Sequence, residues 1–213
     1  MTRTGRSAAR PRGAWRRPGG PQLSHILNGA LDAFYEVGFH GTTVRDIAER
    51  VGLTVPALYY HHRNKEAILA ALLDHSISEV ICRCEQALDE AGPDPRSRFE
   101  NLIACLVLYM SQHRKSAAMD AEIRALGPEN RKAYSAKRMV VERKLIDAIE
   151  AGVAAGDFEV DFPKETARAL LGMCQAITVW YDPAGRVKPE ALARRYQVIA
   201  LRTVVAATAE PSR

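Results

Sequence analysis

The sequence predicts an all-α fold of about nine helices, and three observations lead to this expectation. Beyond residue 21, apolar residues recur at spacings of three and four, which is the period of an amphipathic helix. No convincing period-two pattern of the kind that predicts strands interrupts these stripes. Glycines and prolines stand between the stripes at helix-length intervals, as expected for residues that end or open helices.

The first two helices are predicted from their apolar stripes and their end signals. The first covers residues 23–37 and ends at Gly38. Thr43 and Asp46 have the spacing of a capping box, which predicts that a second helix begins there. Gly52 should end this helix after about two turns.

A third short helix is predicted in the stretch TVPALYYHH, residues 54–62. Thr54 can cap it, and Pro56 is tolerated in its first turn. Leu58 should pack against the second helix, which leaves both tyrosines and the first histidine of the stretch directed outwards. A helix, a tight turn with glycine and an exposed helix form a helix-turn-helix arrangement, whose outward polar tips suit DNA phosphates.

The stretch GFHGTTVRDIAERVGLTVPALYYHHRNKEAIL resembles the DNA-binding half of the TetR family of bacterial repressors. The matching residues are Gly38, Phe39, Gly41, Thr42, Thr43, Val44, Ile47, Ala48, Val51, Gly52, Leu58, Tyr59, Tyr60, His61, Lys65 and Leu69. The resemblance implies a DNA-binding domain at residues 22–66 and a helical effector-binding and dimerisation domain at residues 67–213. Phosphate contacts are expected for Thr43, Tyr60, His61 and Lys65. Base-edge contacts are expected for Arg45, Val55, Pro56 and Tyr59. Thr54, at the start of the third helix, is also expected at the DNA.

One position departs from the family's pattern. The family usually has Phe after the Tyr-His pair, where this chain has His62. A neutral, hydrogen-bonded His62 in the small core is one interpretation, and a proton-sensitive joint is the alternative.

Six further helices complete the prediction, at residues 64–91, 96–113, 116–126, 129–155, 164–180 and 189–207, with Asn64 as the cap of the first. In the TetR family the last two long helices pair with their copies in a second subunit. The stripes that fit such a homodimer are Ala167, Leu170, Leu171, Cys174, Ile177 and Thr178, and Leu192, Tyr196, Ile199, Ala200 and Thr203. Ordinary core within one chain fits them equally. A dimer would place two DNA-binding units on a palindromic operator.

Residues 1–21 form an arginine-rich tail. They hold six arginines and no acid, so this tail has a formal charge of +6. The whole chain has a net charge of +5, so the rest of the chain sums to −1. Gly, Pro, Ala and Arg dominate the segment, which is therefore predicted to be disordered with almost nothing to bury. It is either a solvated tail or an arm that contacts DNA phosphates or the minor groove.

Large, soft side chains on the middle helices are candidate ligand-binding residues, with plain core as the alternative: Phe99, Ile103, Met110, Met119, Ile123, Met139 and Trp180. Residues 148–202 are similar to TetR-type regulators of fatty-acid and sterol catabolism, some of which sense acyl-CoA thioesters. An apolar or amphipathic effector is therefore expected, with an acyl-CoA as one candidate. Five basic residues either meet the phosphates of such a ligand or are simply solvated: Arg114, Lys115, Arg124, Lys137 and Arg138.

Other functional classes lack support in the sequence. Phosphate-binding glycine loops, nucleophile elbows and zinc-protease motifs are absent, so neither catalysis, a cofactor nor a metal is expected. The four cysteines form no CxxC pair and fit free thiols in a reduced cytoplasm. No apolar run reaches the ~18–20 residues that span a bilayer. The expectation is a cytoplasmic homodimeric repressor that a ligand releases from DNA; the alternatives are an architectural DNA-binding protein without an effector and a helical enzyme.

Overall fold

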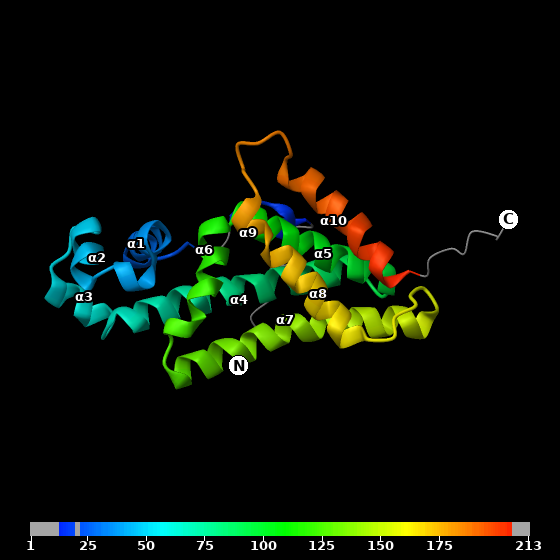
Figure 1. Cartoon of the computed structure of the whole chain (residues 1–213), viewed down its shortest axis with the longest axis horizontal. Coiled ribbons are helices and arrows are strands. Elements are labelled where there is room, and N and C mark those ends of the chain that lie inside the picture. Colours follow the sequence, from blue (N-terminus) through cyan, green and yellow to red (C-terminus); the bar gives the residue numbers. More distant parts are fainter. Residues whose placement is uncertain (1–12, 20–21, 206–213) are drawn as a thin grey trace, which may run out of the picture.

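The computed structural model describes residues 13–19 and 22–205, and these form α-helices and two 3-10 helices without any strand. The predicted all-α class is therefore confirmed. Figure 1 shows two parts joined by one long helix. We call α1 (His25–Gly41), α2 (Val44–Arg50) and α3 (Val55–His61) the head, and the helices from α4 (Lys65–Ala91) onwards the body.

Local signals end and begin the helices as predicted. Gly38 has a φ of 75° and interrupts α1, so that only a short turn follows it. The Asn64 side chain caps α4 by accepting a hydrogen bond from the Ala67 N–H at 2.7 Å. Gly92, with a φ of 70°, ends α4, and Gly156, with a φ of 80°, ends α7.

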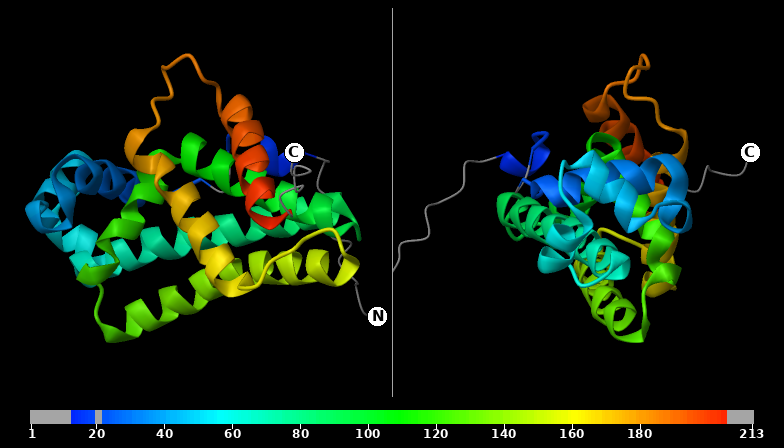
Figure 2. Two further views of the ribbon diagram at one scale, coloured as in Figure 1. Left: turned by 45° about the vertical axis from the view of Figure 1, so that its right-hand side comes forward. Right: turned by 90° about the vertical axis from the view of Figure 1, so that its left-hand side faces the viewer.

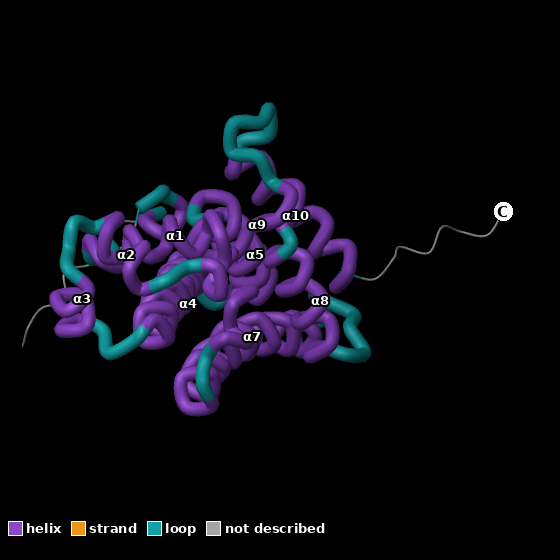
Figure 3. The backbone as a smooth tube through the Cα atoms, turned by 60° about the vertical axis from the view of Figure 1, so that its left-hand side comes forward, coloured by secondary structure: helices purple, strands orange, loops and turns teal. Residues whose placement is uncertain are grey.

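The body packs its helices around α5, whose side chains are buried along most of its length. Its other elements are α6 (Arg114–Ala118), η2 (Met119–Ala125), α7 (Pro128–Ala155), α8 (Pro163–Gln175), α9 (Ile177–Trp180) and α10 (Pro189–Val204), with α5 at Pro95–Gln112. Figure 2 shows α10 beside α5, and α8 running obliquely from α5 to α7. The loop at residues 181–188 projects from the body, as Figure 3 shows.

Two predicted helices are broken in the structure. Residues 116–126 form the end of α6 followed by the tighter η2, rather than one regular helix. Residues 164–180 divide at Ala176 into α8 and the single-turn α9. Tighter 3-10 turns and short breaks of this kind are common near helix ends, where the regular backbone hydrogen bonds run out.

Most of the two stripes proposed for a subunit interface is core within the chain. Ala167, Leu170, Cys174 and Ile177 are buried, and so are Leu192, Tyr196 and Ala200. Another set of apolar residues near α8, α9 and α10 remains exposed: Val179, Trp180, Val198, Ile199 and Val205. The only residue common to the predicted stripes and this exposed set is Ile199.

The prediction of a wholly disordered tail is wrong for residues 13–19. Ala14–Arg16 form the 3-10 helix η1, which packs on α4 and α5, and Trp15 is only 1% exposed. A buried indole ring gives this segment the apolar surface that its composition hides. Arg3, Arg6, Arg10 and Arg12 lie outside the described residues. In the part of the chain that is described, no helix has the length and apolar character needed to cross a membrane.

Candidate nucleic-acid interface and central cavity

Side-chain caps fix the two helices of the helix-turn-helix. The Thr43 hydroxyl accepts a hydrogen bond from the Asp46 N–H at 3.1 Å, and the Asp46 carboxylate accepts one from the Thr43 N–H at 2.8 Å. Thr54 caps α3 by accepting from the Ala57 N–H at 3.3 Å. Gly52 has a φ of 64° in the turn between the helices, a conformation that strains other residues. The predicted capping box, turn and cap are confirmed.

The face of α3 that points away from the molecule carries rings with polar tips. Tyr60 is 88% exposed and Tyr59 is 47% exposed, whereas Leu58 is fully buried against the rest of the head. The Tyr60 ring meets the His61 ring edge-on, with 5.5 Å between centroids. Among the other predicted contacts on this helix, Thr54 and Pro56 are exposed and Val55 is half-buried.

Lys65 has an additional position that the sequence did not predict. Its Nζ donates to the backbone oxygens of Phe39 at 2.7 Å and Thr42 at 2.6 Å, and it lies 4.3 Å from the centre of the Phe39 ring. These contacts join the start of α4 to the end of α1. Lys65 therefore stabilises the head, and only the third N–H of its ammonium group remains for a DNA phosphate.

Two other predicted residues have neighbours that bear on their role. Arg45 is exposed, and its Nε donates to Glu49 Oε1 at 2.9 Å, so reaching a base requires the guanidinium to share or leave this partner. His62 lies one residue past α3 and is half-buried. Burial first, and then the charge of His61, lowers the pKa of His62, which favours the neutral ring. Among the described residues, its ring nitrogens have no hydrogen-bond partner.

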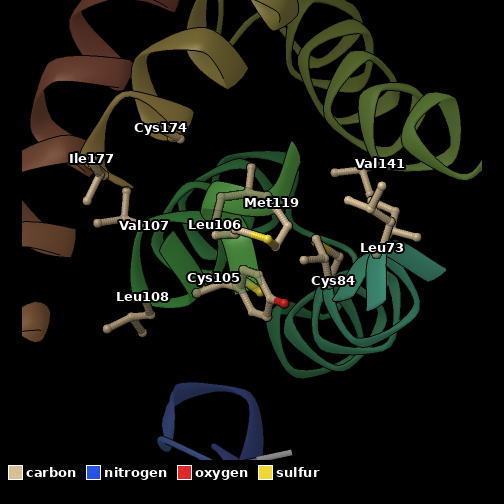
Figure 4. Packing of buried hydrophobic residues seen from close by; sticks show 14 of the residues in the cluster. Leu73, Cys84, Cys105, Leu106, Val107, Leu108, Met119, Val141, Cys174 and Ile177 are labelled. Atoms are coloured by element: carbon tan, nitrogen blue, oxygen red, sulfur yellow. The ribbon is translucent and has the colours of Figure 1, made fainter. Parts of the chain in front are cut away.

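A cavity of about 490 Å³, open to solvent on one side, lies in the body between α4, α5, α7 and α8, and Ala117 of α6 and Asp120 of η2 also line it. Figure 4 shows side chains from these helices turned towards a common interior, among them Leu106, Val141 and Cys174. The apolar part of the wall also includes Ile77, Val80, Met110, Met139 and Leu171, and the polar part consists of Ser76, Tyr109, Asp120, Tyr134, Ser135, Arg138, Glu142, Arg168 and Gln175.

Polar groups in the cavity wall are paired with one another. The Tyr134 hydroxyl donates to Asp120 Oδ1 at 2.8 Å, and Arg138 Nε lies 3.6 Å from the same oxygen. Arg168 Nε donates to Glu142 Oε1 at 2.8 Å. Burial, with the nearby Asp120 charge, raises the pKa of Tyr134, so this phenol stays protonated and can only donate to an anion.

Two family profiles match most of the described chain. The profile of the tetR family of bacterial regulatory proteins matches residues 26–72, which hold the head and the start of α4. The profile of the tetracycline repressor-like C-terminal domain matches residues 92–204, more than half of the chain. The chain belongs to the TetR family. Its helix-turn-helix is the DNA-binding unit of that family.

Similar proteins include regulators of known identity. The transcriptional repressor KstR2 of Rhodococcus jostii is 29% identical over 84% of this chain and 88% of its own. The structure of PfmR, a TetR-family regulator from Thermus thermophilus, has a TM-score of 0.77 and 31% identity, covering 84% of this chain and 98% of its own. The structure of AibR with isovaleryl coenzyme A and operator DNA has a TM-score of 0.73 and 25% identity, covering 82% and 95%.

Of the seven predicted ligand-binding residues, the cavity wall in this TetR-family protein contains Met110 and Met139. Phe99 and Ile103 are fully buried elsewhere, and the Phe99 ring meets Phe158 edge-on at 5.2 Å. The other three lie outside the wall too: Met119 is buried, Ile123 is half-buried and Trp180 is 55% exposed. Ligand contact for Met110 and Met139 stays a prediction.

The basic residues proposed for phosphates divide in the same way. Arg138 lines the cavity, whereas Lys115 pairs with Asp32 at 2.5 Å and Lys137 with Asp74 at 2.5 Å. Arg114 donates to the Thr178 backbone oxygen, and Arg124 is exposed. Arg168, which the sequence reading omitted, is the second guanidinium at the cavity.

The segment from α6 to the start of α7 contacts both the cavity and the head. Its residues Ala117 and Asp120 line the cavity. Lys115 pairs with Asp32 of α1, and Glu122 accepts a hydrogen bond from the Phe39 N–H at 3.2 Å. Glu66, at the start of α4, accepts from the Gly127 N–H and from Asn130 Nδ2, each at 2.8 Å. We call residues 114–130 the bridge.

Ser76 and Tyr109, two cavity residues that were not predicted from the sequence, share one signal. Ser76 follows Leu73 by three residues, and Tyr109 follows Leu106 by three, so both continue an apolar stripe with a polar group. A polar residue on a buried stripe needs a partner, and these two are partners: their hydroxyls lie 2.8 Å apart. Among the described residues, no group of three or more His, Cys, Asp or Glu side chains could hold a metal ion.

Proposed function

We propose that this TetR-family chain is a homodimeric repressor that binds a pseudo-palindromic operator and releases it when an amphipathic ligand fills the central cavity. The observation that carries the proposal is the bridge, which contacts the cavity wall on one side and both α1 and α4 on the other. A ligand that prefers one arrangement of the bridge therefore shifts the position of the head.

The DNA contacts follow from exposure and chemistry. Tyr60, His61 and Thr43 have hydrogen-bonding tips in solvent and suit phosphate oxygens. Tyr59, Pro56 and Val55 occupy the start and outer side of α3, which is the part of a recognition helix that meets base edges. Arg45 and Thr54 flank them, and Lys65 adds positive charge at the start of α4.

The exposed apolar residues near α8 and α10 support a subunit interface. Val198 and Ile199 project from α10, and Val179 and Trp180 from α9, each at least 45% exposed in the single chain. On α8 the neighbouring exposed residues are small, Ala169 and Gly172, which permits close approach of a second helix. Apolar groups gathered in this way are typical of a surface that another protein covers.

The cavity supports an acyl chain with an anionic end as the ligand. A space of about 490 Å³ lies within the range that encloses small ligands, but it is too small for an entire coenzyme A ester. The acyl group would lie among Ile77, Leu106 and Met110. Arg138 and Arg168 would then face the thioester and the phosphates outside. The AibR complex with isovaleryl coenzyme A provides a precedent in a similar fold.

The test is a titration of the protein bound to fluorescent operator DNA that the protein itself has selected from a random library. Acyl-CoA esters of increasing chain length are added, and the matching free acids and coenzyme A alone serve as controls. Release by esters alone supports the proposal. Equal release by the free acids removes the coenzyme A part of it, and failure to select any DNA removes the operator part.

Two arginine variants sharpen this titration. Arg168→Gln removes a guanidinium at the cavity, whereas Arg143→Gln removes one from the outside of α7, where it pairs with Asp147 at 3.3 Å. Only the first should raise the ester concentration needed for release, by about five- to tenfold for one lost charge-assisted contact. Equal behaviour of the two variants would contradict a role for Arg168 in ligand binding.

A further inference from the structure

Residues 13–19, which we call the strap, are held on the body by two charged side chains of α4. Glu90 accepts hydrogen bonds from the Gly13 N–H at 2.8 Å and from Trp15 Nε1 at 3.0 Å, and its carboxylate also pairs with Arg16. The Arg16 guanidinium lies 3.9 Å over the Trp15 ring. Gly13 has a φ of 75°, which suits glycine at this turn.

The second side chain is Arg83, which is 4% exposed and therefore cannot rely on water for its donors. Its Nη1 donates to the backbone oxygens of Trp15 at 3.0 Å and Arg17 at 3.1 Å, and its Nη2 donates to that of Gly19. Its Nε donates to Glu79 Oε1 at 2.9 Å. Three of its acceptors thus belong to the strap, so removing the strap would leave a buried guanidinium short of partners.

Arg83 also connects the strap to the cavity wall. Its Nη2 lies 3.1 Å from His113 Nε2, which must accept because the guanidinium can only donate. The His113 ring stacks on Tyr109 with 4.9 Å between centroids and 15° between planes. Tyr109 and its hydrogen-bond partner Ser76 line the cavity. Only two layers of side chains therefore separate the cavity from the strap.

The other end of the strap leads directly to the head. Five residues separate Gly19 from His25, the first residue of α1. At ~3.5 Å per residue, a docked Gly19 keeps the start of α1 within about 20 Å of Arg83. The strap is held by Arg83 and Glu90 of α4, and it is joined to the head by the chain that precedes α1, a connection that runs neither along the length of α4 nor through the bridge.

We propose that the strap is a positioning element of the repressor: docked through Arg83 and Glu90, it holds α1 in the orientation that fits the operator. This inference rests on the proposed operator binding. It assigns a role in that binding to the strap, Arg83 and Glu90, which are not among the proposed DNA or ligand contacts. Because linkage is reciprocal, operator DNA must in turn favour the docked strap.

An electrostatic arm is the competing explanation, and geometry distinguishes it. Glu90 lies 25 residues after Lys65 on α4, about 37 Å along the helix axis at 1.5 Å per residue. Residues 1–12, which precede the docked Gly13, span at most about 40 Å when fully extended. With the strap docked, their arginines would need almost full extension to reach DNA at the head.

The experiment compares two neighbouring arginines of equal charge. Arg16→Ala removes the pair with Glu90, whereas the hydrogen bonds of Arg17 in the described structure are made by its backbone N–H and backbone oxygen, not by its side chain. Arg16→Ala should weaken operator affinity by about two- to tenfold, and Arg17→Ala should leave it unchanged. Glu90→Gln keeps the shape but weakens the hold on the strap, so it should also weaken binding. An arm acting by charge alone predicts equal losses for the two arginines and tighter binding for Glu90→Gln.

Tryptophan fluorescence follows docking without reference to DNA affinity. The chain has two tryptophans, and Trp180→Phe leaves Trp15 as the reporter. Because Trp180 belongs to the proposed subunit interface, sedimentation velocity first checks that this background variant associates as the wild type does. Docked Trp15 should resist quenching by acrylamide, and Arg16→Ala or Glu90→Gln should expose it in protein that melts as one folded unit. Adding operator should protect Trp15 further, and DNA of scrambled sequence should not.

Two results would overturn the proposal. One is a strap variant that exposes Trp15 yet binds the operator with unchanged affinity; the other is operator binding without any protection of Trp15. If the wild-type protein selects no DNA, the proposed function fails first, and the fluorescence comparison still shows whether the strap docks.

Discussion

In the head, polar-tipped side chains point outwards from a small core, whereas in the body they point inwards around a cavity. Tyr60 is exposed, and its helix is held in place by the buried Leu58 and by the Thr54 cap. Tyr134 is buried, and its hydroxyl is held by a hydrogen bond to another cavity residue, Asp120. The head thus presents its polar groups to solvent, where DNA can reach them, while the polar groups of the cavity wall are paired with one another.

This difference explains why the two parts need different kinds of rigidity. A DNA backbone offers fixed phosphate positions, so the head benefits from caps that hold α2 and α3 in advance. The proposed release of DNA by a ligand requires two arrangements of the body that differ little in free energy. The pair of Arg168 and Glu142 suits this proposal, because a ligand anion can replace Glu142 beside Arg168 while the partly exposed carboxylate turns to water.

The largest expected effect comes from removing the support of the head. Leu58→Ala deletes a fully buried side chain and should lower the free energy of unfolding of the head by about 2–5 kcal/mol. Because the head core is small, we expect it to unfold while the body stays helical. Hydrogen exchange should show faster exchange in residues 25–61 alone. Simultaneous loss of protection in α5 would instead mean that head and body unfold as one unit.

A second variant tests whether the body relies on another subunit. Ile199→Asp places a charge on the exposed side of α10 and should weaken dimerisation by about 2 kcal/mol or more if that side is buried between subunits. Sedimentation velocity at several concentrations measures this. Glu190→Ala, a change at the exposed start of α10, is the control. A wild-type monomer, or an unchanged dimer in the variant, would contradict the interface.

The next pair separates DNA contact from support within the head. Tyr60→Ala removes an exposed ring and should lower operator affinity by about 1 kcal/mol without changing the melting temperature. Lys65→Ala should lower both, because its ammonium holds the carbonyl oxygens of Phe39 and Thr42. It should also reduce the salt dependence of binding by about one unit for all sequences if it contacts phosphate. A Lys65 effect on stability alone would assign the residue to support only.

The head could be predicted almost residue by residue because its signals are local. The Thr43–Asp46 capping box and the Thr54 cap each join residues only three positions apart, Gly52 acts through its own backbone, and all three are present in the structure. The exposure of Tyr60 follows from the burial of Leu58 two positions away. Lys65 escaped prediction because its acceptors, Phe39 and Thr42, are more than twenty residues distant.

The cavity and the strap could not be predicted in this way. Cavity residues come from α4, α5, α7, α8 and the bridge, so which polar side chains meet depends on helix packing and not on spacing in the sequence. Arg168 and Glu142 are one such pair. For the strap, composition misled. The buried indole of Trp15, the carbonyl oxygens that Arg83 binds and the N–H groups that Glu90 accepts from outweigh a segment otherwise rich in Gly, Pro and Arg. The signal in the sequence was Arg83, which follows Val80 by three residues on the apolar stripe of α4 and therefore needs partners for its charge.

The smallest expected effect concerns His62, which lies between the head and α4. Burial lowers its pKa below the ordinary value of 6.5, so the folded protein binds a proton less readily than the unfolded chain. Its contribution to stability is therefore complete above that value and is lost as the pH falls through the lowered one. His62→Phe should reduce the loss of melting temperature between about pH 7 and about pH 5, and the exposed His40→Phe should not. The half-buried His113, whose pKa is also lowered mainly by burial, should leave part of the slope in place. If operator affinity falls over the same range in the wild type but not in His62→Phe, the residue is a proton-sensitive joint; if only stability changes, it is a neutral member of the head core.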